Sequence, residues 1–199
     1  MRKLLIATGN RGKVKELQTL LASLEVELII PKDIGLDLEV VEDGLTYAEN
    51  AGKKARAYSQ ASGMIALADD SGLEVDALDG APGLYSARYS PLPQATDADR
   101  RAYLLQNLEK KARPWTAHFH ATIAIGVPEQ QVLFAEGNCL GQIIPDERGE
   151  NGFGYDPIFY IPELQRTMAQ LSMQEKNRLS HRALAVNNAL PLLRKVLAG

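Results

Sequence analysis

The stretch from residue 64 to residue 72 reads Met64-Ile65-Ala66-Leu67-Ala68-Asp69-Asp70-Ser71-Gly72. Its first five residues are a continuous apolar run, which predicts a buried strand over 64–68 that delivers two adjacent carboxylates at its carboxyl end. A capping pattern at Thr46 predicts a helix just before this strand, running to about Ala61 and stopped by Gly63. A helix that leads into a buried strand is typical of an α/β sheet.

The alternation of helices and strands continues on both sides of this stretch. Helices are predicted over 14–24, 96–111 and 182–197, and strands over 3–8, 26–30, 115–127 and 131–144. The last two strands are expected to pair as an antiparallel hairpin, and the glycine- and proline-rich segment 79–94 to form a loop. Together these elements predict an α/β fold with a mixed central sheet, flanking helices and a smaller lobe that carries residues 79–110.

The bulk composition narrows the class of protein. The 199 residues fit one domain, or two lobes that share a core. A chain that is 45% hydrophobic and 24% charged, with a net charge of −3, is ordinary for a globular protein and argues against nonspecific nucleic-acid or membrane binding.

Two further features bear on the compartment. Cys139 is the only cysteine, which excludes an intrachain disulfide and a cysteine-rich metal site. The apolar run 4–7 is too short for a signal peptide, and no segment approaches the roughly 18 apolar residues of a membrane span. We therefore expect a cytoplasmic protein.

The first candidate site is a turn between a strand and a helix, which reads Thr8-Gly9-Asn10-Arg11-Gly12-Lys13. Such a turn presents backbone N–H groups to an anion at the start of a helix, and Lys13 adds a positive charge. It is not a Walker A loop, because its glycines are too close together and Val14 stands where a Ser or Thr would bind magnesium. The turn predicts a phosphate site, with a tight turn and a solvated lysine as the open alternative.

The second candidate is the pair Asp69 and Asp70. Two carboxylates after an apolar strand suit Mg²⁺, which is usually shared with substrate phosphates, and one of them is placed to accept a proton from water. The alternative is a turn in which Asp70 caps the next segment. An acidic cluster upstream offers Glu42 as a further metal ligand, although most of its members are expected to be solvated surface charges.

The third candidate is a glycine-rich turn, which reads Gly152-Phe153-Gly154-Tyr155-Asp156-Pro157. Flanking glycines expose an aromatic face on which a planar base can stack. Further along, Lys176, His181 and Arg182 supply donors that suit a purine O6 acceptor. The alternatives are a hairpin turn that packs Phe153 into the core and a polar cluster at the start of the last helix.

Five motifs, taken in order, resemble the inosine-triphosphatase family of purine triphosphate pyrophosphatases. They are the turn at Thr8 to Lys13, the Ala68-Asp69-Asp70-Ser71-Gly72 segment, the Gly80 to Tyr89 loop, the Gly152 to Pro157 turn and Ser180-His181-Arg182. Any one of them is weak, but five in the right order over residues 3 to about 190 are specific. The resemblance implies an elongated two-lobed α/β fold formed by residues 1–199 as a single pyrophosphatase domain, and a homodimer.

The resemblance also implies an activity and the residues that perform it. The activity is the Mg²⁺-dependent hydrolysis of ITP, dITP and XTP to the monophosphate and pyrophosphate, which cleanses the nucleotide pool. By resemblance, Asp70 is the proton acceptor and a metal ligand, Glu42 is a second ligand, and Asp69 is a neighbour of the metal. The substrate contacts implied are Thr8, Gly9, Asn10, Arg11, Gly12, Lys13, Ser71, Phe153, Gly154, Tyr155, Asp156, Lys176, His181 and Arg182.

Two rival functions stay open at this point. One is a related pyrophosphatase that acts on standard nucleotides such as dTTP or UTP, against which His181 and Arg182 argue because they suit a 6-keto purine. The other is a nucleotide-sensing module without turnover. A module of that kind has no need of paired acids beside bound phosphates.

Overall fold

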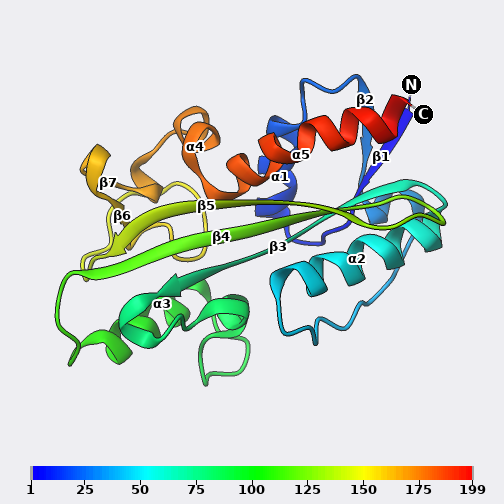
Figure 1. The fold of residues 1–199 in the computed structure, drawn as a ribbon. Helices are drawn as coiled ribbons and strands as arrows, with labels where there is room; N and C mark the ends of the chain where they lie inside the picture. The colour runs from blue at the N-terminus through cyan, green and yellow to red at the C-terminus, as the bar shows by residue number, and fades with distance from the viewer. Residues whose placement is uncertain (1, 199) are drawn as a thin grey trace. The chain divides into compact units, whose positions relative to one another are not determined.

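A computed structural model describes residues 2–198 of the chain. Its strands are β1 (Arg2–Ile6), β2 (Val26–Ile29), β3 (Ile65–Val75), β4 (Trp115–Gly126), β5 (Leu133–Ile143), β6 (Phe159–Ile161) and β7 (Arg166–Thr167). Its α-helices are α1 (Arg11–Leu20), α2 (Tyr47–Ser62), α3 (Asp97–Leu108), α4 (Met173–Leu179) and α5 (His181–Ala198). The predicted α/β class is confirmed (Figure 1).

The strands form one mixed sheet in the order β2-β1-β3-β4-β5-β6-β7. β1 pairs in parallel with both β2 and β3, whereas β5 with β6 and β6 with β7 are antiparallel. β4 and β5 are neighbours joined by the short segment 127–132, which confirms the predicted hairpin because a parallel crossover needs a dozen or more residues.

The chain divides into two compact units. Unit 1 contains residues 2–70, 121–137 and 182–198, and unit 2 contains residues 71–120 and 138–181. Strands β3, β4 and β5 each pass from one unit to the other part way along, so the division does not coincide with the ends of these elements.

In unit 1 the strands are covered on both faces, as Figure 1 shows for α5 on one side and α2 on the other. Leu4, Ile6 and Leu67 pack with the apolar faces of α1 and α5, while Ala7 and Ala68 face α2. This alternation is the two-residue period of a strand. Successive residues of β1 and β3 therefore belong to different layers.

Helix α2 lies very close to the sheet. A Cβ added at Gly126 in β4 would lie 2.4 Å from the carbonyl oxygen of Ala55 in α2. Small residues thus let the helix backbone approach the strand. The cap at Thr46, which accepts from the N–H of Glu49, and the left-handed Gly63 at the other end confirm the predicted limits of this helix.

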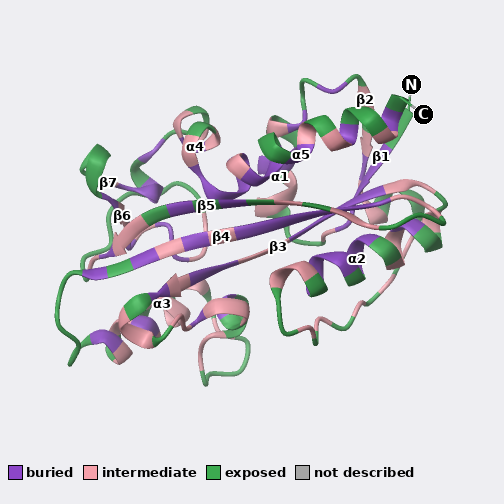
Figure 2. Ribbon diagram, viewed as in Figure 1, coloured by how far each residue is buried: buried purple, intermediate pink, exposed green. Residues whose placement is uncertain are grey.

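Unit 2 has its own core, which the purple segments of β3, β4 and β5 mark in Figure 2. Leu73, Leu104 and Phe159 are fully buried there, and Phe119 lies in tilted contact with Phe159 at a centroid distance of 4.4 Å. The segment predicted as a loop is mostly irregular and includes a 3-10 helix over Gly83–Arg88.

One boundary differs from the prediction in a way that matters for the site. The expectation that the strand ends at Ala68 is wrong, because β3 continues to Val75 and contains Asp69 and Asp70. The turn alternative, in which Asp70 caps the next segment, is wrong for the same reason. Since the two carboxylates lie within a strand, they point to opposite faces of the sheet.

Candidate active site

The turn from Thr8 to Lys13 has the predicted strand-turn-helix form. Asn10 caps α1 by accepting from the Lys13 N–H at 3.1 Å, and the Thr8 hydroxyl oxygen accepts from the Asn10 N–H at 3.2 Å. Arg11 is exposed and Gly12 is partly buried at the start of the helix. A helix start held in this way is suited to bind an anion.

The solvated-lysine alternative for this turn is wrong. The Lys13 Nζ lies 2.8 Å from the Asp69 Oδ2, and the side chain is largely buried. Burial lowers the pKa of Lys13 below its usual value, and Asp69 opposes that shift. Lys13 thus connects the phosphate turn to the acidic pair in β3.

Asp69 is the centre of a buried ion-pair network on the α1 and α5 side of unit 1. Its Oδ2 accepts from the Arg182 Nε at 3.2 Å and from the Arg182 Nη2 at 3.1 Å, in addition to Lys13. The Arg182 Nη1 donates to the Glu16 Oε2 at 2.5 Å. The Arg182 side chain is only 1% exposed, so its donors are directed at two buried carboxylates.

The charges of this network decide the protonation of Asp69. Burial by itself raises the pKa of Asp69, but Arg182 and Lys13 outweigh it and hold the pKa well below the ordinary 3.8. Arg182 is likewise held charged, because Asp69 and Glu16 raise its pKa against the effect of burial. The two cations thus favour the ionised form of Asp69.

Asp70 lies on the other side of β3, beside α2. The Lys54 Nζ is 3.9 Å from the Asp70 Oδ1 and 3.1 Å from the Glu42 Oε2, and it donates to the backbone oxygen of Asp69 at 2.9 Å. Glu42 and Asp70 thus share one cation, so Glu42 is not a merely solvated surface charge.

The electrostatics of Asp70 differ from those of Asp69. Burial raises the pKa of Asp70, and the negative charges of Glu42 and Asp69 add to this, although Lys54 and Lys13 oppose it. A carboxylate whose pKa is raised is a better proton acceptor near neutral pH. The two neighbouring acids thus have different chemistry, which the sequence alone does not distinguish.

Glu42 and Asp70 are the two carboxylates that could hold a magnesium ion, because both lie beside the same ammonium group. Within residues 2–198 no group of three or more His, Cys, Asp or Glu side chains has the arrangement of a metal site. The Lys54 ammonium beside both carboxylates shows that a cation is favourable there. Mg²⁺ commonly takes one or two carboxylates and completes its shell with water and substrate phosphates. The Asp69 side chain points to the other face of β3, where its Oδ2 is bound by Lys13 and Arg182.

Unit 2 holds the glycine-rich turn in a defined conformation. Gly152 and Gly154 have positive φ values of 78° and 63°. The Phe153 N–H donates to the Asp156 Oδ2 at 2.9 Å, and the same carboxylate oxygen lies 2.6 Å from the Lys176 Nζ. Asp156 and Lys176 are both buried, so they brace the turn from inside.

The two aromatic residues of this turn differ in exposure. Phe153 is partly exposed, with the Lys176 Nζ 5.1 Å from its ring centroid, so the core-packing alternative does not describe it fully. Tyr155 is buried and its hydroxyl donates to the backbone oxygen of Ser86 at 2.8 Å. Phe153 is therefore the ring available for stacking, while Tyr155 anchors the turn to the Gly80 to Tyr89 loop.

His181 and Ser71 complete the predicted set in unit 2. The His181 ring stacks on Phe119 with centroids 4.7 Å apart and an interplanar angle of 17°. His181 is nearly buried, whereas Ser71, which follows Asp70 in β3, is half-buried. The imidazole plane is thus fixed by an aromatic neighbour on β4.

Several residues of the site were missed in the sequence. Lys54 and Glu16 are charged residues on buried helix faces, and Lys54 stands between the fully buried Ala51 and Ala55. A charge within an apolar helix face is the signal that could have found them. Phe119 gave no such signal, because an apolar residue in a predicted strand is expected to belong to the hydrophobic core.

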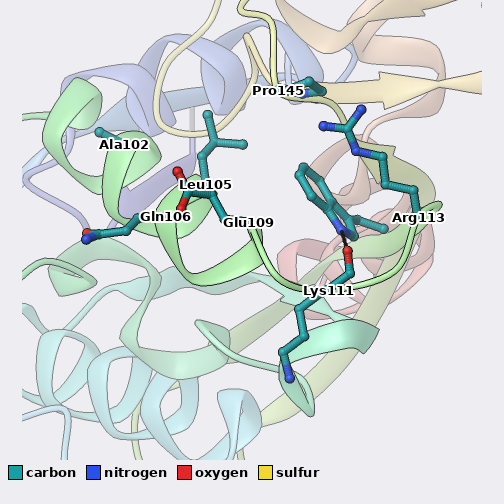
Figure 3. Close-up of a pocket in the computed structure, with 8 residues that line it drawn as sticks. Ala102, Leu105, Gln106, Glu109, Lys111, Arg113 and Pro145 are labelled. Atoms are coloured by element: carbon teal, nitrogen blue, oxygen red, sulfur yellow. Dashed lines mark hydrogen bonds between the residues drawn. The ribbon is translucent and has the colours of Figure 1, made fainter.

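Two hollows lie on the surface, one in each unit. One, of about 670 Å³, is bordered by Thr8, Gly9 and Arg11 in unit 1. The other, of about 380 Å³ in unit 2, is bordered by α3 and by Trp115, whose ring lies 4.5 Å from the Arg113 guanidinium (Figure 3). No predicted site residue borders the second hollow.

Comparison with known proteins gives consistent matches over nearly the whole chain. The pattern that defines the Ham1 family matches residues 4–192. The chain is 47% identical over 195 residues to the dITP/XTP pyrophosphatase of Desulforamulus reducens, covering 98% of this chain and 96% of that protein. It is 44% identical over 199 residues to the dITP/XTP pyrophosphatase of Listeria monocytogenes, covering 100% of this chain and 96% of that protein.

Solved structures agree with these matches. A HAM1 protein from Coxiella burnetii superposes with a TM-score of 0.88 at 41% identity, covering 98% of this chain and 100% of that chain. The Ham1 protein of Staphylococcus aureus gives a TM-score of 0.86 at 38% identity, covering 98% and 99%. All the candidate residues lie within the matched region.

Proposed function

This chain belongs to the Ham1 family, and from that premise we propose that it hydrolyses non-standard purine nucleoside triphosphates such as ITP, dITP and XTP. The products are the nucleoside monophosphate and pyrophosphate. Relatives that are 44% and 47% identical over nearly their full length carry the name dITP/XTP pyrophosphatase, which supports the proposal.

The observation that carries the proposal is the separation of the two acids in β3. Asp70, which lies beside Lys54 on the α2 side of β3, is assigned to accept the proton of the attacking water as the anhydride bond between the α and β phosphates breaks. Asp69, held as an anion, is assigned to keep Lys13 and the phosphate turn in place. Arg182 is assigned to hold Asp69.

Magnesium is proposed as the cofactor, with Glu42 and Asp70 as the residues that hold it. When bound, the ion supplies neutralisation of phosphate charge and a lowered pKa for water. Lys54 lies beside the same two carboxylates and is assigned to the phosphate chain as a further cation.

The base is assigned to unit 2. Phe153 offers a ring face for stacking, and His181, fixed against Phe119, offers a donor for the O6 acceptor of a 6-keto purine. Adenine presents an amino group at that position, so a donor that faces it would be left without a partner.

The experiment is a pyrophosphate-release screen with ITP, XTP, GTP, ATP and dTTP, with Mg²⁺ and with EDTA. We expect ITP and XTP to be hydrolysed fastest and EDTA to abolish the reaction. Faster turnover of dTTP than of ITP would contradict the purine assignment.

A variant of Asp70 tests the proposed base. Asp70→Asn should lower kcat by about 10² to 10⁴, the usual contribution of a general base, while the exposed control Asp146→Asn keeps wild-type turnover. Unchanged turnover in Asp70→Asn would exclude Asp70 as the proton acceptor.

The assembly and compartment are proposed from the family resemblance. We propose that the chain acts as a homodimer in the cytoplasm. Light scattering coupled to gel filtration tests the dimer, and a mass of one chain would contradict it. Among residues 2–198 there is no helix with both the length and the hydropathy to cross a membrane.

A further inference from the structure

Helix α3 binds the glycine-rich turn at a single residue, Gly154. The Asp97 Oδ2 accepts from the Gly154 N–H at 2.7 Å, and the Arg101 Nη1 donates to the Gly154 backbone oxygen at 2.8 Å. Asp97 and Arg101 are four residues apart, so they lie on the same face of the helix. Both polar groups of the Gly154 backbone are thus bound by one helix.

The position of Gly154 gives this contact its importance. Gly154 follows Phe153 directly and has a left-handed backbone, so small changes in its dihedral angles redirect the Phe153 ring. The backbone of Phe153 is held as well, because its N–H donates to Asp156. The contacts of α3 with Gly154 are therefore a second set of bonds that hold the turn at the partly exposed Phe153.

Both side chains that bind Gly154, those of Asp97 and Arg101, also form ion pairs. Arg101 forms a two-point pair with Glu147, in which its Nε lies 2.8 Å from Oε1 and its Nη2 2.9 Å from Oε2. Asp97 pairs with Arg100. Burial raises the pKa of Asp97, but the Gly154 N–H and Arg100 more than offset this and lower it. Asp97 is accordingly ionised near neutral pH, and its ion pair and that of Arg101 hold both side chains in place.

We propose that Asp97 and Arg101 are positioning residues that fix the Phe153 to Tyr155 turn for the base of the nucleotide. The inference rests on the proposed function, because the turn is there assigned to the base. It goes beyond that function in giving a role to α3, none of whose residues was a candidate in the sequence.

The central prediction concerns substrate affinity. Asp97→Ala should raise KM for ITP about tenfold, which corresponds to about 1.4 kcal/mol, with kcat within about twofold of wild type. Loss of binding that is equal in ground and transition states raises KM alone. Asp97→Asn keeps an acceptor oxygen for the Gly154 N–H, so it should restore most of the affinity.

A matched control separates positioning from helix stability. Asp99 lies in the same first turn of α3 and bonds only Thr96 among its described hydrogen bonds. Asp99→Ala removes the two bonds that the Asp99 carboxylate accepts from Thr96 and should lower the thermal midpoint without changing KM for ITP. An equal KM in Asp97→Ala and Asp99→Ala would overturn the proposal.

The second test uses a ligand that has no nucleobase. Inorganic tripolyphosphate should inhibit the wild type and Asp97→Ala with the same inhibition constant, because it does not use the turn. A parallel rise in that constant and in KM for ITP would show a general loss of structure and would overturn the proposal. Arg101→Met should behave as Asp97→Ala does, and Glu147→Gln should have a smaller effect because the contact of Arg101 with Gly154 remains.

The contact itself is checked without any turnover. The Gly154 amide proton should shift in NMR spectra as Asp97 titrates below its ordinary pKa of 3.8, and Asp99→Ala should preserve this shift. A Gly154 amide signal that is unchanged in Asp97→Ala would refute the contact. If the contact is present and the wild type hydrolyses no ITP, the proposed function fails instead.

Discussion

Replacing Arg182 by methionine tests the buried network of unit 1. Methionine keeps much of the apolar stem but removes the guanidinium that bonds Asp69 and Glu16. Both carboxylates then lose the guanidinium in a buried environment, while Lys13 stays 2.8 Å from Asp69.

The magnitude follows from that geometry. Removing one partner of a buried ion pair costs about 3 to 5 kcal/mol, because the remaining charge is not compensated. Here two buried carboxylates lose one shared guanidinium and Asp69 keeps Lys13, so we expect a loss of about 4 kcal/mol. For a chain of this length such a loss corresponds to a fall of about 8 to 16 °C in Tm.

Urea unfolding followed by circular dichroism is the assay, with the midpoint and slope fitted separately. Arg194→Met, an exposed arginine in the same helix, should change stability by less than about 0.5 kcal/mol. Glu16→Gln should cost about 1 to 3 kcal/mol, since Arg182 keeps its bonds to Asp69. A loss below about 1 kcal/mol for Arg182→Met would refute the reasoning, because the arginine would then not be the necessary counter-charge.

Three further predictions address other parts of the chain. Gly126→Ala should destabilise the protein by about 1 to 3 kcal/mol in urea unfolding, because its Cβ meets the Ala55 carbonyl, and unchanged stability would show that α2 can move away. Lys54→Met should raise the pH at which activity is half-lost on acidification, because it removes the cation that favours ionised Asp70; an unmoved profile would contradict this. The bonds that Glu175 accepts lower its pKa to about 2, so the stability they contribute is present above pH 4.5 and lost as the pH falls toward 2; Glu175→Gln should flatten that part of the curve, and an identical curve would contradict the assignment.

Features set by neighbouring residues could be predicted from the sequence. The N-cap predicted at Thr46 is confirmed, because a cap is a hydrogen bond between a side chain and a backbone group three residues away. The hairpin of β4 and β5 is local in the same sense. These elements need no knowledge of the rest of the fold.

Features set by distant residues could not be predicted. The sequence predicts a strand that ends at Ala68, yet β3 continues to Val75 within the sheet. The bond between Asp69 and Arg182 joins positions 113 residues apart, and no local pattern announces it. Lys54 was missed because its partners come from another segment and from β3.

The continuation of β3 through the two acids has a consequence for how the chain can change. Because successive residues of a strand alternate between faces, inserting or deleting one residue between 65 and 69 would exchange the surroundings of Asp69 and Asp70. Asp69 would then face Lys54, and Asp70, the proposed proton acceptor, would lie beside Arg182. The parity of the strand, as much as the identity of the residues, keeps the two acids in their separate roles.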